Sequence, residues 1–185
     1  MVTIKTQLTL DEFLTLPETD LNYELINGEA IPKIPPKRFH SRIRGTLCTL
    51  LTQWCQNQGE IGIEWAVILK KNNRDWVPIP DLLYISYSRL PLDRFIDEAC
   101  PVPPELVIEI ISPDQTFGQM SEKAIDYLNA GVLRVWVIDP KAKIITIFYP
   151  DAPPQTKRDE AILTDNLLEG LQFTPQQIFQ QAGII

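Results

Sequence analysis

A carboxylate interrupts the most apolar stretch of the chain. In "ELVIEII", residues 105–111, Glu109 stands within a run of Leu, Val and Ile. Such runs are typical of a strand that is buried on both faces of a sheet. An unpaired carboxylate there would cost several kcal/mol, so we expect a compensating partner. The candidates are a cation, a metal ion, or water in a cleft.

Asp81 and Glu24 are two further acids with apolar neighbours. Asp81 follows Pro80 and opens "DLLYIS". Because proline lacks an amide N–H and marks strand entrances, we expect Asp81 at one end of a sheet. Glu24 lies in "YELINGEAI", where two short strands flank an Asn-Gly pair, the strongest two-residue hairpin signal. In this hairpin Glu24 lies opposite Ile31, which also leaves its charge in need of a partner.

Lys123 is a cation that could join these acids. It falls in the first turn of a helix predicted at 121–130, where the helix dipole does not stabilise a cation, and Tyr127 shares its face. Two or three carboxylates with one lysine suit Mg²⁺ or Mn²⁺, which prefer oxygen ligands. The lysine could then orient a metal-bound water or stabilise charge on a phosphate. Taken singly, each acid also fits a salt bridge, and Lys123 also fits a solvated helix face.

The elements that must position these residues are short and alternate in type. The sequence predicts two short elements at the N-terminus, a capped helix at 10–16 and the Asn-Gly hairpin. Later helices are predicted at 39–58 and 121–130, and a last one opens at Thr174-Pro175. Five strand-like runs are predicted, at 61–71, 78–87, 105–111, 133–139 and 144–150. This order predicts an α+β fold with a central mixed sheet flanked by helices.

The 185 residues are enough for one domain with a substantial core. We expect a single domain over 1–185, with its core at about 8–150. Residues 151–185, with an extended piece at 161–171, are expected to pack on it as a C-terminal extension. The composition is 44% hydrophobic and 22% charged, which is typical of a soluble globular protein.

Nothing in the sequence predicts a membrane partner or export. No apolar run approaches the roughly 20 residues that span a bilayer, and the first residues lack a signal-peptide pattern. A cytoplasmic location is therefore expected. Cys48, Cys55 and Cys100 lack metal-ligand spacing, and we interpret them as free thiols that fill apolar space.

The charge distribution gives a mixed indication about nucleic acid. A net charge of -7 argues against non-specific adhesion to it. Five cations nevertheless fall close together without an intervening acid: Lys33, Lys37, Arg38, Arg42 and Arg44. They fit either a solvated helix face or a patch that contacts a phosphate backbone. His40, the single histidine, lies beside the apolar stripe of helix 39–58 and fits either a half-buried structural residue or a phosphate contact.

Several motifs together resemble a known family. They are "YELINGE", "FHSRIRGTL", "PIPDLLYIS" and "PPELVIEIISPDQ", followed by "EKAIDYLNAGVLRVWVIDP". The sequence resembles a bacterial family of restriction-endonuclease-like proteins, a domain of unknown function within the PD-(D/E)XK nuclease superfamily. The likeness runs from about residue 8 to residue 149 and is most specific over 104–140. It implies the restriction-endonuclease-like fold.

The resemblance also implies roles for individual residues. Pro80-Asp81 matches the "PD" of the superfamily motif, and Glu109 matches its second acid. The motif expects a lysine two residues later, where Ile111 stands. In this family the lysine has moved to the following helix, and Lys123 is the matching position.

The implied metal ligands are Asp81, Glu109 and the backbone carbonyl of Ile110. Glu24 resembles an additional family acid that helps to hold the metal or its water, and Lys123 would position the attacking water. The implied activity is Mg²⁺-dependent hydrolysis of DNA by an endonuclease, with Mn²⁺ as a possible substitute. The residues expected to contact the nucleic acid are Arg38, His40 and Arg42.

Other readings of the same residues stay open. The protein could keep the nuclease fold as a catalytically silent nucleic-acid-binding or scaffold protein, or act on RNA or a nucleotide. A homodimer is also expected, because nucleases of this fold that cut both strands often pair two active sites. The strand pair near "VWVID" or the C-terminal tail could supply the interface.

Overall fold

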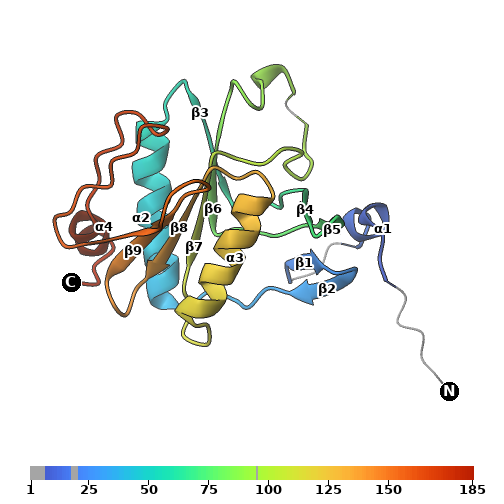
Figure 1. The fold of residues 1–185 in the computed structure, drawn as a ribbon, viewed down its shortest axis with the longest axis horizontal. Helices are drawn as coiled ribbons and strands as arrows, with labels where there is room; N and C mark the ends of the chain where they lie inside the picture. Colours follow the sequence, from blue (N-terminus) through green and yellow to red (C-terminus); the bar gives the residue numbers. More distant parts are fainter. Residues whose placement is uncertain (1–6, 18–20, 95) are drawn as a thin grey trace.

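A six-stranded mixed sheet lies at the centre of the molecule (Figure 1). The computed structural model describes residues 7–17, 21–94 and 96–185. The strand order is β10-β9-β8-β7-β6-β3, in which β7 and β8 are parallel and all other neighbours are antiparallel. The strands are β3 (Gly59–Ile63), β6 (Leu82–Ser86), β7 (Leu106–Ile110), β8 (Arg134–Asp139), β9 (Ile144–Phe148) and β10 (Gln155–Arg158).

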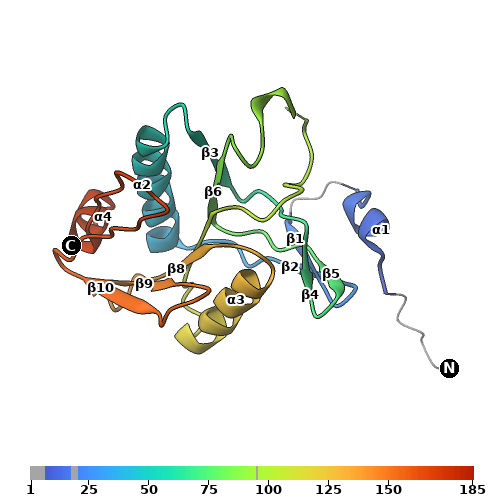
Figure 2. The same ribbon diagram turned by 45° about the horizontal axis from the view of Figure 1, so that its top comes forward.

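Helices cover both faces of this sheet (Figures 1 and 2). One face carries α2 (Arg38–Trp54) and α4 (Pro175–Gln181), and the other carries α3 (Phe117–Asn129), which connects β7 to β8. Because side chains alternate along a strand, Leu106 and Ile108 of β7 pack on the α2 side, whereas Val107 packs on the α3 side. The same alternation directs Glu109 toward α3.

Two small hairpins and a short helix lie beside the main sheet. They are formed by β1 (Tyr23–Ile26) with β2 (Glu29–Pro32) and by β4 (Leu69–Lys71) with β5 (Arg74–Trp76), next to α1 (Leu10–Leu14). Leu25 of β1 and Val77 exchange two backbone hydrogen bonds of 3.0 and 3.1 Å. This bridge holds the N-terminal hairpin beside the segment that leads into β6, and therefore beside Asp81. The hairpin register pairs Glu24 with Ile31, as the Asn-Gly turn predicts.

The C-terminal residues complete the core on the α2 side. Leu163, Leu168, Leu171, Ile178 and Phe179 are buried in one cluster with α2 and the sheet. A short 3-10 helix, η1 (Leu92–Arg94), lies in the long loop between β6 and β7. In the ranges 7–17, 21–94 and 96–185, no helix combines the length and apolar character needed to cross a membrane.

The predicted fold class is confirmed, but several boundaries differ. The strand predicted at 61–71 is interrupted, because Glu64 takes a left-handed backbone conformation with φ of 47°. As a result β3 belongs to the main sheet, whereas β4 forms a separate hairpin. The helix predicted at 121–130 begins at Phe117, because Thr116 and Gln119 form a capping box. Lys123 therefore lies in the middle of α3 and not in its first turn.

Other departures concern the helix ends and the C-terminal part. The first helix ends at Leu14 and the long helix ends at Trp54, both earlier than predicted. β10 lies in a polar stretch for which the sequence predicted no strand, and it forms an edge strand against β9. The extended piece predicted at 161–171 has only an isolated bridge, between Leu163 and Phe173. The "VWVID" segment lies in β8, a central strand, so it is not an exposed surface for dimer formation.

Candidate active site

The structure brings the four residues predicted to act in catalysis to one cavity. Glu24 from β1, Asp81 at the entrance of β6, Glu109 from β7 and Lys123 from α3 all line a cavity of about 180 Å³. Four separate segments of the chain thus meet at one place, and the three carboxylates are all buried there.

Asp81 is held from three directions. One carboxylate oxygen, Oδ2, accepts a hydrogen bond of 2.7 Å from the Ile110 amide and lies 2.9 Å from Nε2 of His40. The other oxygen accepts a hydrogen bond of 2.8 Å from the ammonium of Lys33. Burial alone would raise the pKa of Asp81, but the hydrogen bond to His40 and the charge of Lys33 outweigh it and hold that pKa well below its ordinary value.

Glu109 has two partners on α3. Its Oε1 accepts a hydrogen bond of 2.8 Å from the hydroxyl of Tyr127 and lies 2.9 Å from Nζ of Lys123. Burial raises the pKa of Glu109, although the charge of Lys123 opposes the rise. Burial and the adjacent carboxylate raise the pKa of Tyr127 well above its ordinary value, so its hydroxyl stays a hydrogen-bond donor. In this structure the partners that the buried carboxylate requires are a cation and a phenol.

Lys123 bridges two of the acids. Its Nζ lies 2.9 Å from Oε1 of Glu109 and 2.9 Å from Oε1 of Glu24. The same oxygen of Glu24 also accepts a hydrogen bond of 2.9 Å from the Ile79 amide. Burial would lower the pKa of Lys123, but the two carboxylates raise it above its ordinary value. Lys123 is therefore a fixed positive charge in the cavity.

The sequence named Lys33 only among the five neighbouring cations and did not place it in the site. Besides Asp81 it contacts Glu64 at 3.5 Å, and Glu64 lies 2.8 Å from Arg44. The hairpin register could have indicated that Lys33 lies near the site, because Tyr23 pairs with Pro32. Lys33 is the next residue, so it lies beside the strand that carries Glu24. The partners of Lys33 lie far away in the sequence, which hides this ion-pair network from any local pattern.

The five neighbouring cations do not form one surface patch. Lys33 and Arg44 join a half-buried ion-pair network through Glu64, and Lys37 pairs with Asp114 at 3.0 Å on the surface. Arg42 donates a hydrogen bond to the carbonyl of Ala182 at the end of α4 and does not line the cavity of the three carboxylates. Arg38 lies at the start of α2 and lines a different, larger cavity. Neither a single solvated helix face nor a single phosphate-contacting patch describes this arrangement.

His40 lies within the site. Its side chain is buried, and Nε2 faces Asp81 while Nδ1 is buried without a hydrogen-bond partner among the described residues. Ser112 fits a turn residue, since its amide donates a 3.0 Å hydrogen bond to Oε1 of Gln115. Both Ser112 and Gln115 line the same cavity as the three carboxylates.

The chemistry of the donors fits a hard divalent cation. Carboxylate oxygens are the ligands that Mg²⁺ and Mn²⁺ prefer, and three carboxylates face one cavity. In the arrangement described here, Lys33 and Lys123 form ion pairs with these three carboxylates. Within residues 7–17, 21–94 and 96–185 no three acidic, His or Cys side chains are arranged as a metal cluster.

Comparison with known proteins gives the family. Residues 10–176 match the Uma2 family, which is described as "Putative restriction endonuclease". The chain belongs to the Uma2 family. This assignment agrees with the likeness to the PD-(D/E)XK superfamily that the motifs indicate. No curated protein matches the sequence significantly.

A solved structure supports the same assignment. The chain is similar to a crystal structure described as a "putative nuclease belonging to DUF820" from Anabaena variabilis ATCC 29413. The TM-score is 0.82 at 25% sequence identity, and the match covers 95% of this chain and 99% of that one. The Uma2 assignment and this likeness together support a nuclease role.

Proposed function

We propose that this Uma2 protein is a metal-dependent endonuclease that hydrolyses DNA phosphodiester bonds. The observation that carries the proposal is the convergence of Glu24, Asp81 and Glu109 with Lys123 on one small cavity. Buried acids with shifted pKa values beside a specific cation are typical of functional sites. The family and the structural likeness support nucleic acid as the substrate class.

In this proposal the carboxylates of Asp81, Glu109 and Glu24, with the backbone carbonyl of Ile110, would hold Mg²⁺, for which Mn²⁺ could substitute. The ion supplies Lewis acidity and an activated water when bound. Lys123 stays protonated and can hold the attacking water or stabilise negative charge that develops on the phosphate. Tyr127 fixes the orientation of Glu109, and His40 fixes that of Asp81.

A cleavage assay with variants tests the proposal. Supercoiled plasmid, single-stranded DNA and RNA would be incubated with the protein in Mg²⁺ or Mn²⁺. Glu109→Gln and Lys123→Ala are expected to lose cleavage, whereas Glu122→Gln, an exposed neighbour on the same helix, is expected to keep it. Isothermal calorimetry should show that Asp81→Ala and Glu109→Ala abolish metal binding. Cleavage that survives in Glu109→Gln would refute the assigned site.

A second candidate is a catalytically silent binding or scaffold protein. It is favoured by one observation, the ion pairs of Lys33 and Lys123 with the carboxylates that a metal would need. In that case the ion pairs are the permanent state of the cavity, and the protein cuts none of the three substrates and binds no divalent metal. Cleavage of RNA alone would instead move the proposed substrate from DNA to RNA.

We also propose that the protein forms a homodimer in the cytoplasm. Two active sites would allow cleavage of both strands of a duplex. All three cysteines are free, as expected in a reducing compartment. With β8 in the sheet centre, the C-terminal extension is the remaining interface among those expected from the sequence. Light scattering at micromolar concentration tests the assembly, and a monomer mass would contradict it.

A further inference from the structure

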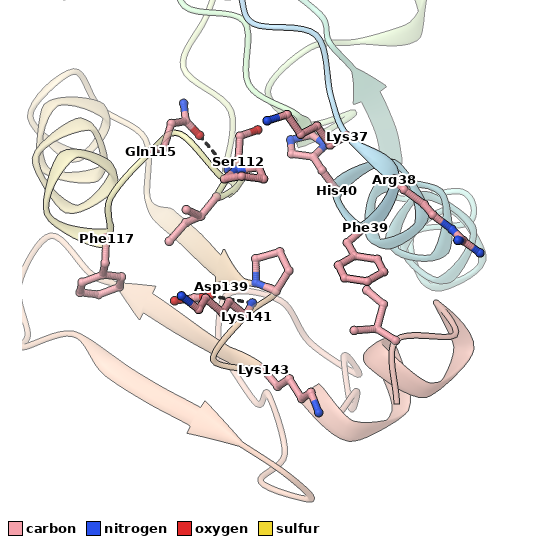
Figure 3. Close-up of a pocket in the computed structure, with 14 residues that line it drawn as sticks. Lys37, Arg38, Phe39, His40, Ser112, Gln115, Phe117, Asp139, Lys141 and Lys143 are labelled. Atoms are coloured by element: carbon pink, nitrogen blue, oxygen red, sulfur yellow. Dashed lines mark hydrogen bonds between the residues drawn. The ribbon is translucent and has the colours of Figure 1, made fainter.

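A second and larger cavity opens beside the catalytic one. It has a volume of about 790 Å³ and shares His40, Ser112 and Gln115 with the catalytic cavity. Figure 3 shows that its walls come from the start of α2, the loop between β7 and α3, and the turn between β8 and β9. A chain bound in this cavity would therefore lead directly to the carboxylates.

Two exposed aromatic rings belong to the wall of this cavity. The side chains of Phe39 and Phe117 are 53% and 41% exposed, which leaves large apolar faces open to solvent. In Figure 3 they stand on opposite sides of the cavity, one at the head of α2 and the other at the head of α3. Phe117 meets Phe148 at a ring-centroid distance of 6.5 Å, and in the described part of the chain no ring contact involves Phe39.

The same wall carries an excess of positive charge. Lys141 and Lys143 come from the turn between β8 and β9, and neither has an ion-pair partner within the described ranges. Lys37 pairs with Asp114, but both side chains are more than half exposed, so the pair is weak and a phosphate can replace it. The one acid in the lining, Asp139, accepts hydrogen bonds from the amides of Lys141 and Ala142. This local charge contrasts with the net charge of -7 of the whole chain.

We propose that this cavity binds an unpaired DNA strand next to the catalytic site. Phe39 and Phe117 stack on bases, while Lys141 and Lys143 contact phosphates. Base stacking on aromatic side chains combined with a positively charged groove is the general mode by which proteins hold single strands. The faces of bases are accessible only in an unpaired strand, because a duplex stacks them on each other. The volume lies in the range of about 300–1,000 Å³ found for small-ligand pockets, which is the scale of a few nucleotides.

This inference rests on the proposed nuclease function, so the test uses binding without cleavage. Fluorescence anisotropy would measure the Kd of a labelled 20-nucleotide single strand and of the matching duplex in EDTA. The single strand is expected to bind more tightly, by about tenfold or more. Phe39→Leu and Phe117→Leu keep apolar volume but lose the ring face, and each should weaken single-strand binding by about tenfold. Phe39→Trp keeps an aromatic ring and should bind the single strand as tightly as the wild type. Ile125→Ala, at an exposed position, should have no effect on binding.

The lysines have a separate readout. Lys141→Gln and Lys143→Gln should each reduce the salt dependence of single-strand binding, by about 0.7 in the slope of log K against log salt. Lys70→Gln, an exposed lysine outside the cavity, should leave the slope unchanged. Polyglutamate, a polyanion without bases, is expected to bind the wild type and the variants much more weakly than the single strand does. Circular dichroism would establish that each variant is folded.

The outcomes separate this inference from the proposed function. Single-strand binding that depends on the rings and lysines supports the cavity assignment even if no cleavage is found with metal. Metal-dependent cleavage together with unchanged binding in both leucine variants overturns the cavity assignment and leaves the nuclease proposal intact. Equal affinity for duplex and single strand, or no single-strand binding, also overturns it.

Discussion

Lys33 and Lys123 each form ion pairs with carboxylates of the candidate site. The role of Lys33 follows from the structure alone. Its ammonium lies 2.8 Å from Asp81 and also donates a 2.9 Å hydrogen bond to the carbonyl of Ile79. Removing one partner of a buried ion pair leaves an uncompensated charge. Lys33→Met should therefore lower the free energy of unfolding by about 3 kcal/mol in urea denaturation. Lys37→Met breaks only an exposed pair and should change it by less than about 0.5 kcal/mol.

The same variant gives a test of metal binding that needs no activity. In Lys33→Met the carboxylate of Asp81 lacks its ammonium partner, so a divalent cation at Asp81 would stabilise the folded state. Millimolar Mg²⁺ should then restore part of the lost free energy of unfolding, and EDTA should reverse the effect. An identical response in Lys33→Met and Lys37→Met would argue against Asp81 as a metal ligand.

Asp81 should make stability depend on pH in the acidic range. Because its pKa is lower in the folded than in the unfolded chain, ionised Asp81 stabilises the fold at every pH above about 4. This contribution is lost as the pH falls through the folded-state pKa. Asp81→Asn should therefore be less stable than the wild type by about 3 kcal/mol at pH 7, with the difference shrinking below pH 4. Urea unfolding at several pH values would measure it, and a difference that is constant down to pH 3 would contradict it.

At this scale the sequence predicted the acids better than their partners. Glu109 and Asp81 stand out because a carboxylate beside apolar strand residues is unusual, and both do line the cavity. Lys33 and His40 stand 48 and 41 residues from Asp81, so no local pattern links them to it. The ion pairs of the site are long-range contacts that only the folded chain brings together.

At the scale of elements, β3 and α2 contain glycines with opposite requirements. A Cβ at Gly59 would lie 2.3 Å from the carbonyl oxygen of Ile85 in the paired strand β6. A Cβ at Gly45, within α2, would meet nothing within 4 Å. Gly59→Ala should therefore cost about 2–3 kcal/mol through overpacking. Gly45→Ala should stabilise the protein by about 0.5–1 kcal/mol, because glycine is a poor helix former.

Thermal unfolding of these two variants should shift the midpoint in opposite directions. If Gly59→Ala kept the wild-type midpoint, the close pairing of β3 with β6 would be wrong. The comparison uses the same substitution twice, so a general effect of alanine cannot explain a difference in sign.

The sequence predicted the buried strands but not every element or boundary. The apolar runs of β6, β7, β8 and β9 predicted these strands because buried strands need them. β10 was missed because Gln155–Arg158 is a polar edge strand, defined by its pairing with β9 and not by its composition. The break after β3 depends on one backbone conformation, at Glu64, which periodicity does not reveal.

At the scale of the whole molecule, the C-terminal extension shares a core with α2, one of the elements that form the candidate site. Phe179 of α4 is 1% exposed and lies in the same cluster as Ile43 and Leu47 of α2, the helix that also presents His40 to Asp81. We therefore propose that residues 151–185 belong to the same domain as the site. The packing of α4 on α2 then helps to set the position of the helix that bears His40.

Phe179→Ala tests this coupling. Deleting a buried aromatic side chain leaves a cavity, and the free energy of unfolding should fall by about 3–5 kcal/mol. Phe39→Ala, at a side chain that is 53% exposed, should cost much less. Urea denaturation followed both by tryptophan fluorescence and by circular dichroism should give a single transition, because one core unfolds as one unit. If Phe179→Ala instead produced two separate transitions, with the early one confined to the C-terminal residues, the extension would be an independent unit and its packing on α2 would not support the catalytic cavity.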